Sequence, residues 1–299
     1  MTAMKKYNET GLARYHPLVS FCYFTAVLGG TLLFIHPLFA GISLLCAVTY
    51  ACLLNGKNGA KLSLLMGLPM ALLIAAGNPL FNHRGATFLF YLRDNPVTLE
   101  ALAYGAVMGA MLFASVMWFS CYNIVVTSDK FLYIFGRIFP TGALIASMTL
   151  KLIPQLLQRV KLIADTQRTL GLDWKSGSLI RRIRSGARIL SILVGWALEE
   201  AVVTADSMNA RGYGSHRRSN FSVFIFSKRD RGLLLCILGM MLCEAAAYLR
   251  GTGTLIFYPT ILPMASGIPD LLFYAAFLAL GLVPIILQIR ENRRWNFLK

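Results

Sequence analysis

Stretches of chain without a charged side chain constrain this fold more than any other feature of the sequence. No Asp, Glu, Lys or Arg occurs between Arg14 and Lys57, and three more long runs share this property: Leu62–Asn82, Ala101–Ser128 and Leu271–Ile289. A helix needs roughly 20 apolar residues to cross about 30 Å of hydrocarbon, and only a helix satisfies its backbone polar groups there locally. We therefore expect an all-α integral membrane protein.

The number of spans follows from the length of each run. The first run is long enough for two spans with a turn near His36, and Leu233–Leu249 adds one that only Glu244 interrupts. With 57% hydrophobic and 14% charged residues, the chain is too apolar for an ordinary soluble domain. The charged N-terminus lacks a short apolar core with a cleavage site, so we expect no removable signal peptide. We expect about six spans, at approximately 18–35, 38–54, 62–79, 100–126, 232–250 and 269–289.

The basic residues predict the orientation of these spans. Lysines and arginines gather at the N-terminus, in the turn NGKNGAK at 55–61 and at the C-terminus, whereas the expected outer loops hold only Arg84, Arg93 and Arg250. Cytoplasmic loops of membrane proteins carry an excess of Lys and Arg. A topology with both termini in the cytoplasm satisfies this rule.

The stretch 130–231 differs from the rest of the chain because it carries 17 of the 29 basic residues and 6 of the 13 acidic ones. We expect a cytoplasmic helical domain here, inserted between spans four and five. The chain then divides into 1–129, 130–231 and 232–299. Most of these cations are expected to face anionic lipid head groups. No aromatic-interleaved basic strand accompanies them, so a nucleic-acid partner is not expected.

Apolar residues at spacings of three and four predict two long helices within this domain. Pro140 and Pro154 are expected to break or kink the first helix, which stops at Gly171, and the second runs from about Leu179 to Gly212. Their ends, ADTQRTLG (164–171) and ADSMNARG (205–212), share Ala, Asp and the final Gly in register. One interpretation is two ordinary C-terminal caps. The other is a pair of helix tips offered to two similar partners.

The segment SMNARGYG, about forty residues after QRTLG, resembles the transmembrane T component of energy-coupling factor (ECF) transporters, the EcfT/CbiQ family. The likeness includes LKLIPQLLQRVKLIADTQR, the early YHPL and NPLFNHRG, so it extends over most of the chain. It implies a scaffold in the bacterial cytoplasmic membrane that is not itself an enzyme. Such a scaffold joins a membrane substrate-binding S component to two ATP-binding-cassette ATPases, which drive uptake of a vitamin or metal ion.

The resemblance also implies which residues contact the ATPases. The second family motif is matched by Ala210, Arg211 and Gly212, and Tyr213 follows as a flat anchor. In the first motif, Gln167, Arg168 and Gly171 match, but Leu170 stands where the family often has arginine. Either Arg168 replaces that arginine or the first contact is mainly apolar. Small residues favour close helix packing in lipid, which makes Gly142, Ala143, Ala146 and Gly195 candidates for the S-component interface.

Other function classes have less support in the sequence. No GxxxxGK[ST] motif occurs, and the cysteines and histidines lack the spacing of metal ligands, so neither cofactor nor metal is expected. Glu244 favours an autonomous secondary transporter if it relays protons or cations within the membrane. Alternatively, it lies near the outer end of its helix, paired with Arg250 or facing water. No inverted repeat supports the secondary transporter, and no convergent polar cluster supports a membrane enzyme.

Overall fold

The computed structural model describes residues 11–82, 85–92, 95–172, 178–215, 224–251, 255–258 and 268–297. The chain divides into two compact units, one formed by Met1–Phe131 with Phe224–Lys299 and the other by Leu132–Val223. The described residues are almost entirely helical, which confirms the all-α class. Arg84 and Arg93 of the expected outer loops, and most of the loop after Gly171, lie outside the described residues.

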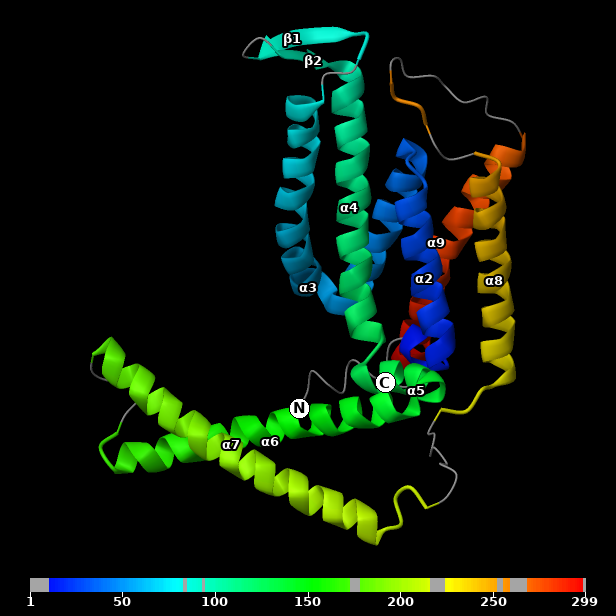
Figure 1. The fold of residues 1–299 in the computed structure, drawn as a ribbon. Coiled ribbons are helices and arrows are strands. Elements are labelled where there is room, and N and C mark those ends of the chain that lie inside the picture. Colours follow the sequence, from blue (N-terminus) through cyan, green and yellow to red (C-terminus); the bar gives the residue numbers. More distant parts are fainter. Residues whose placement is uncertain are drawn as a thin grey trace. The chain divides into compact units, whose positions relative to one another are not determined.

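Unit 1 is a bundle of long helices capped by a small hairpin (Figure 1). Its elements are η1 (Leu12–Arg14), α2 (Pro17–Leu33), α3 (Pro37–Phe81), β1 (Phe88–Leu92), β2 (Asn95–Thr98), α4 (Leu99–Val125), α8 (Lys228–Leu249) and α9 (Ile268–Phe297). The two strands pair antiparallel, with a register shift between Phe88 and Phe90. The chain enters unit 2 through α5 (Ser128–Ile138), and unit 2 then contains α6 (Pro140–Thr169) and α7 (Leu179–Ala210).

The second and third expected spans are joined differently from the prediction. The sequence predicted a turn at NGKNGAK, but α3 stays helical from Pro37 to Phe81. A straight helix of 45 residues would be roughly 68 Å long. Instead α3 bends sharply (Figure 1), and both halves contact α4: Ser43 hydrogen-bonds Trp118 and Asn78 hydrogen-bonds the carbonyl of Ala101. The chain therefore reverses as expected, through a bend in the helix rather than a loop.

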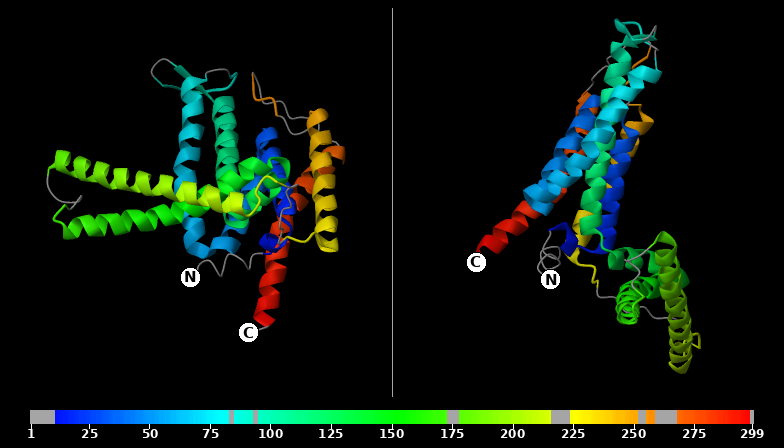
Figure 2. Two further views of the ribbon diagram at one scale, coloured as in Figure 1. Left: turned by 60° about the horizontal axis from the view of Figure 1, so that its bottom comes forward. Right: turned by 90° about the vertical axis from the view of Figure 1, so that its left-hand side faces the viewer.

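Within the described residues, four helical segments are long and apolar enough to cross a membrane: Pro37–Leu54, Leu99–Val125, Lys228–Leu249 and Asp270–Arg293. These correspond to the second, fourth, fifth and sixth expected spans. The other two expected spans fall on shorter apolar helices, α2 and Gly67–Phe81. The structure thus identifies a multi-pass membrane protein. Helix α9 continues beyond the predicted end of its span, and its last turns extend past the neighbouring helices of unit 1 (Figure 2).

The core of unit 1 surrounds Trp118, which is fully buried and contacts the rings of Tyr23 and Tyr50. Its indole N–H donates to Ser43 Oγ at 3.0 Å, and Ser43 Oγ lies 2.8 Å from Thr31 Oγ1. A buried indole N–H needs such a partner, because an unpaired polar group is costly away from water. This chain of hydroxyls fixes α2, α3 and α4 relative to one another.

Helices α3 and α4 approach closely through small residues on both sides. A Cβ atom added at Gly105 would lie 2.7 Å from the carbonyl oxygen of Ala75, and one at Gly109 would lie 2.7 Å from that of Ala71. The two glycines are four residues apart, as are the two alanines, so they form matching stripes on the two helices. Small residues at this spacing let helix backbones pack closely in lipid, where hydrophobic burial gives helices little attraction for one another.

Polar contacts tie the helices together at one end of unit 1, which we call the basal end: η1, the start of α2 and α8, and the end of α4 and α9. The backbone N–H of Gly11 donates to Gln288 Oε1 at 2.8 Å, and that of His16 donates to Asp230 Oδ1 at 3.1 Å. Burial lowers the pKa of His16, and nearby Asp230 partly offsets this effect. These contacts connect η1 and α2 to α9 and α8.

Lys130 completes the basal end from α5. Its Nζ donates to the carbonyl oxygens of Ala13 and Val125 at 2.7 and 2.9 Å, and the side chain is 6% exposed. Burial lowers the pKa of Lys130 to about 8, because the interior disfavours the charged form. Since Val125 ends α4, this lysine caps that helix where the chain leaves the bundle, and a cation suits the negative end of a helix.

We expect Gly109→Ala to destabilise the bundle, whereas Gly77→Ala is the matched control because a Cβ there meets nothing within 4 Å. Both changes favour helix formation, but only the first forces α3 away from α4, at a cost of about 1–3 kcal/mol. Thermal unfolding of the purified protein in detergent measures the difference. Equal melting temperatures for the two variants would show that the close approach of the two helices does not limit stability.

Candidate functional site

The candidate functional site consists of the two helix tips that end α6 and α7 in unit 2. At the first tip, the N–H of Leu172 donates to the carbonyl oxygen of Gln167 and the N–H of Gly171 donates to that of Arg168, both at 3.0 Å. This pair of bonds is the Schellman arrangement that closes many helices. It requires a residue in the left-handed conformation, and Gly171 has φ 75°.

The second tip repeats this geometry. The N–H of Tyr213 donates to the carbonyl oxygen of Met208, and the N–H of Gly212 donates to that of Asn209, again at 3.0 Å. Gly212 also has φ 75°. The capping interpretation of the two sequence ends is therefore confirmed. It does not exclude the other interpretation, because a helix cap can also be a contact surface.

The two tips are equivalent in backbone geometry and different in chemistry. Leu170 (φ −85°, ψ 7°) and Arg211 (φ −83°, ψ 6°) occupy the same position, directly before the left-handed glycine. Both side chains are exposed, and Leu170 is 72% exposed. One tip thus presents an apolar side chain and the other a guanidinium at the same place. The backbone geometry thus aligns Leu170 with Arg211 without using the residues that the two segments share.

The other predicted tip residues differ in exposure. Arg168, Gly171, Ala210, Gly212 and Tyr213 are exposed, but Gln167 is only 5% exposed. The Gln167 side chain is buried, and the Gln167 backbone carbonyl accepts the hydrogen bond from Leu172 that closes the tip. Its position favours a role in shaping the first tip over direct contact with a partner.

The helices that carry the tips cross within unit 2 (Figure 1). The guanidinium of Arg159 on α6 lies 4.8 Å from the centre of the Trp196 ring on α7. This cation–π contact, together with the buried Ser185 and Ile189 on α7, holds the pair in unit 2. This contact was not predicted, because nothing in a linear pattern pairs residues 37 positions apart. Pro140 begins α6 and breaks the chain as predicted, whereas Pro154 lies inside an unbroken helix.

The candidate residues for the S-component interface lie in two settings. A Cβ at Gly142 would lie 2.1 Å from the Phe139 ring, and Ala143 packs against Gly136 of α5, so both residues shape the corner between α5 and α6. Ala146 is half-buried. Gly195 is exposed on α7, and a Cβ there would meet nothing within 4 Å. Among these four, Gly195 offers the most open surface.

Glu244 does not lie where the sequence analysis favoured. It was expected to pair with Arg250 or to face water, but it is 9% exposed and its Oε1 has no hydrogen-bond partner among the described residues. The Glu244 side chain extends from α8 towards Gly30 of α2. A Cβ atom added at Gly30 would lie 3.1 Å from the Glu244 carboxyl carbon and 2.8 Å from the Phe277 ring. An isolated carboxylate is costly in such surroundings, so we expect Glu244 to be protonated. Three more buried side-chain oxygens, of Tyr23, Tyr50 and Gln167, also lack partners within the described residues.

Comparison with known proteins adds an independent observation. The family model described as cobalt transport protein (CbiQ) matches residues 19–222, which is more than half of the chain and includes both helix tips. The chain belongs to the CbiQ family. This confirms the resemblance seen in the sequence motifs.

Curated relatives of this CbiQ family member are named "Energy-coupling factor transporter transmembrane protein EcfT". The protein from Lactobacillus helveticus is 37% identical over 29% of the chain and 32% of its own length. Those from Streptococcus thermophilus and Exiguobacterium sibiricum are 31% and 33% identical, over 32% and 36% of the chain. The chain spans only 37% and 41% of these two relatives. With the apolar helices, the likeness identifies a multi-pass membrane protein related to ECF transporter components.

Two buried carboxyl groups give a test of the protonation expected for Glu244. Glu100 is 3% exposed and accepts hydrogen bonds from the N–H and hydroxyl of Thr87, whereas Glu244 Oε1 accepts none from the described residues. We expect Glu100→Gln to lower the melting temperature by several degrees, because the amide replaces an acceptor oxygen with a donor. Glu244→Gln should leave it unchanged or raise it. A drop for Glu244→Gln as large as that for Glu100→Gln would contradict a neutral Glu244.

Proposed function

We propose that this protein is the transmembrane coupling subunit of an ECF-type importer. In this role it transmits a conformational change from two cytoplasmic ATPases to a membrane S component that binds a vitamin or a metal ion. The observation that carries the proposal is the pair of helix tips. Two crossing helices of one unit end in the same backbone geometry, as two contacts with two related ATPase subunits require. Family membership and the names of the relatives support the same role.

The chemistry of each tip suits a groove on a folded partner. Arg211 offers five N–H donors in a rigid fork, which can bind carboxylates or backbone carbonyls in a fixed orientation. Gly212 has no side chain, so a partner's backbone can approach the end of the helix closely. Tyr213 lies next in the chain and is 41% exposed, and aromatic side chains are frequent anchors at interfaces. The second tip is thus suited to transmit force towards the partner and away from it.

The first tip fits a partner of different surface character. Leu170 occupies the position of Arg211 and is 72% exposed, so the first contact is apolar at its centre. Arg168 lies two residues earlier and is also exposed, so it can add a charged contact at the edge. Both alternatives from the sequence, an apolar first contact and a contact through Arg168, are compatible with this arrangement. They apply to different parts of the same surface.

The proposed topology places all six apolar helices across the bacterial cytoplasmic membrane. The bend in α3 makes two spans from one helix, and α2 with Gly67–Phe81 completes the six. Unit 2 then lies in the cytoplasm, as do both termini, because most basic residues belong to that side. This orientation brings the two helix tips to the compartment that contains ATP.

We expect Arg211→Ala to leave the protein in the membrane and to lower ATP-dependent uptake at least tenfold, because a charge-assisted contact at the centre of an interface typically contributes 2 kcal/mol or more. Uptake and ATP hydrolysis are measured together in proteoliposomes containing the whole transporter. Arg182→Ala is the matched control, since it removes an exposed arginine near the other end of α7. Wild-type uptake by the Arg211 variant would falsify the assignment of this tip.

We expect Gly195→Trp to reduce co-purification of the S component severalfold, because a large side chain replaces open space on a face suited to a partner helix. Gly186→Trp is the matched control. Position 186 also has nothing within 4 Å of an added Cβ, and nine residues of helix place it on the opposite face of α7. Equal loss in both variants, or loss in neither, would remove Gly195 from the S-component interface.

A secondary transporter remains the second candidate function, because Glu244 is a buried carboxyl without a partner among the described residues. The same proteoliposomes separate the two functions. Liposomes that contain this chain alone should take up no substrate under an ion gradient. Gradient-driven uptake that Glu244→Gln abolishes would establish the secondary transporter instead.

A further inference from the structure

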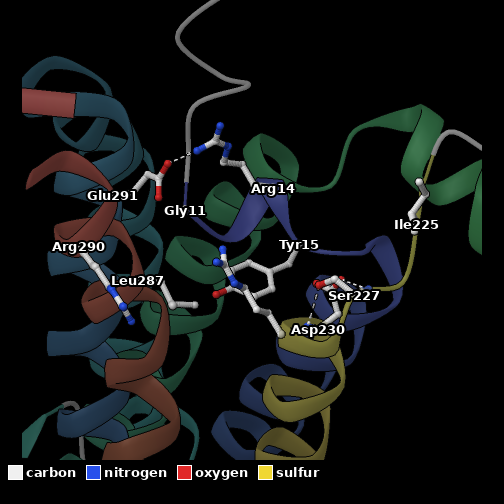
Figure 3. A pocket seen from close by; sticks show the side chains of 10 residues that line it. Gly11, Arg14, Tyr15, Ile225, Ser227, Asp230, Leu287, Arg290 and Glu291 are labelled. Atoms are coloured by element: carbon white, nitrogen blue, oxygen red, sulfur yellow. Dashed lines mark hydrogen bonds and ion pairs between the residues drawn. The ribbon is translucent and has the colours of Figure 1, made fainter. Parts of the chain in front are cut away.

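A cavity of about 480 Å³ opens at the basal end of unit 1 (Figure 3). Its walls come from three segments far apart in the sequence: η1 with Tyr15, the start of α8 and the end of α9. Each segment contributes one arginine to the lining, namely Arg14, Arg229 and Arg290. Three guanidinium groups around one cavity repel one another, so their convergence indicates a negatively charged ligand.

Among the described residues, the two carboxylates that line the cavity pair with only one of these arginines. Asp230 Oδ1 accepts the N–H of His16, and its Oδ2 accepts both the N–H and the hydroxyl of Ser227. Glu291 forms an ion pair with Arg14, drawn as a dashed line in Figure 3. Within the described part of the chain, no hydrogen bond or ion pair engages Arg229 or Arg290. The lining carries three arginines and two carboxylates, a formal net charge of +1, and the guanidinium groups of Arg229 and Arg290 have no hydrogen-bond or ion-pair partner among the described residues.

The position of the cavity along the helices indicates the source of the ligand. Arg229 lies in the first turn of the apolar segment Lys228–Leu249, and Arg290 lies in the last turn of Asp270–Arg293. In the topology proposed above, on which this step rests, these two helix ends lie where lipid head groups meet water. Ile225 also lines the cavity, on the side away from Arg290 (Figure 3), and is 85% exposed. A phospholipid, in which a phosphate adjoins the glycerol and the apolar acyl chains, matches this combination of positive charge and apolar surface.

We propose that this cavity binds the phosphate head group of an anionic phospholipid, held by Arg229 and Arg290. A guanidinium group can bind phosphate through two parallel N–H···O hydrogen bonds, and basic pockets between membrane helices are suited to such head groups. The bound lipid bridges α8 and α9 at the end where η1, α2 and α5 are also fixed. It stabilises the basal end in membranes that contain anionic lipid.

The test titrates the purified protein in detergent with a fluorescent phosphatidylglycerol, and with phosphatidylcholine as the neutral lipid. We expect phosphatidylglycerol to bind at least about tenfold more tightly, and the double variant Arg229→Gln/Arg290→Gln to lose this preference. The double variant Arg231→Gln/Arg293→Gln is the matched control, because it removes the same charge from the same helix ends outside the cavity lining. Equal loss in both double variants would overturn the site in favour of diffuse surface charge.

Two further measurements define the ligand. Arg229→Lys/Arg290→Lys keeps the charge and removes the paired geometry, so we expect it to bind phosphatidylglycerol severalfold more weakly than the native protein. Full binding by this variant would overturn a built phosphate site. Glycerol 3-phosphate and inorganic phosphate are then titrated without lipid. Binding of either as tight as that of phosphatidylglycerol would assign the cavity to a soluble phosphate compound and overturn the lipid.

Discussion

Hydrogen bonding of the backbone inside a hydrocarbon layer is the constraint on which this structure depends. Water is absent there, so each membrane-crossing segment must be helical and can leave polar groups unpaired only at its ends. Several of these helices accordingly begin with a side-chain cap. His16 and His36 each accept an N–H through Nδ1 directly before a proline that starts a helix, and Ser227 forms a reciprocal capping box with Asp230. Thr98 accepts an N–H at the start of α4 in the same way.

Most of the distinctive chemistry of the protein is found at such helix ends. The two tips of unit 2 are helix ends whose closing hydrogen bonds leave the side chains before each glycine free to meet a partner. At the basal end of unit 1, interhelical bonds from Gln288 and Asp230 secure η1 and α2, and Lys130 caps α4. The same hydrogen bonds that fix the bundle use up the Asp230 carboxylate. Arg229 therefore remains available to an external anion.

The two tips also show how one geometry serves two chemistries. A Schellman closure depends on backbone bonds and a left-handed glycine, so the residue before that glycine is free to vary. Leucine at one tip and arginine at the other change the exposed side chain without changing the shape of the helix end. Crossing helices joined by Arg159 and Trp196 give both tips a common support.

Local signals explain what the sequence predicted well. Charge-free runs located the apolar helices, Pro140 marked the break before α6, and Gly171 and Gly212 marked the two helix ends. Each of these features acts on the backbone within a few residues, so a linear pattern is sufficient to detect it. The family motifs located the second tip for the same reason. The pattern failed at NGKNGAK, where α3 bends without leaving the helix.

Long-range contacts decided the rest. The sequence by itself determined a multi-span helical protein with two similar helix ends in a basic insertion. Only the tertiary structure placed Gly109 against the backbone of Ala71, buried Glu244 beside Gly30, turned Gln167 inward and brought three arginines around one cavity. The physical reason is that burial and pairing depend on which helix faces which. Periodicity identifies the apolar face of a helix, but in lipid nearly every helix face is apolar. The apolar pattern therefore does not predict which helices pack against each other.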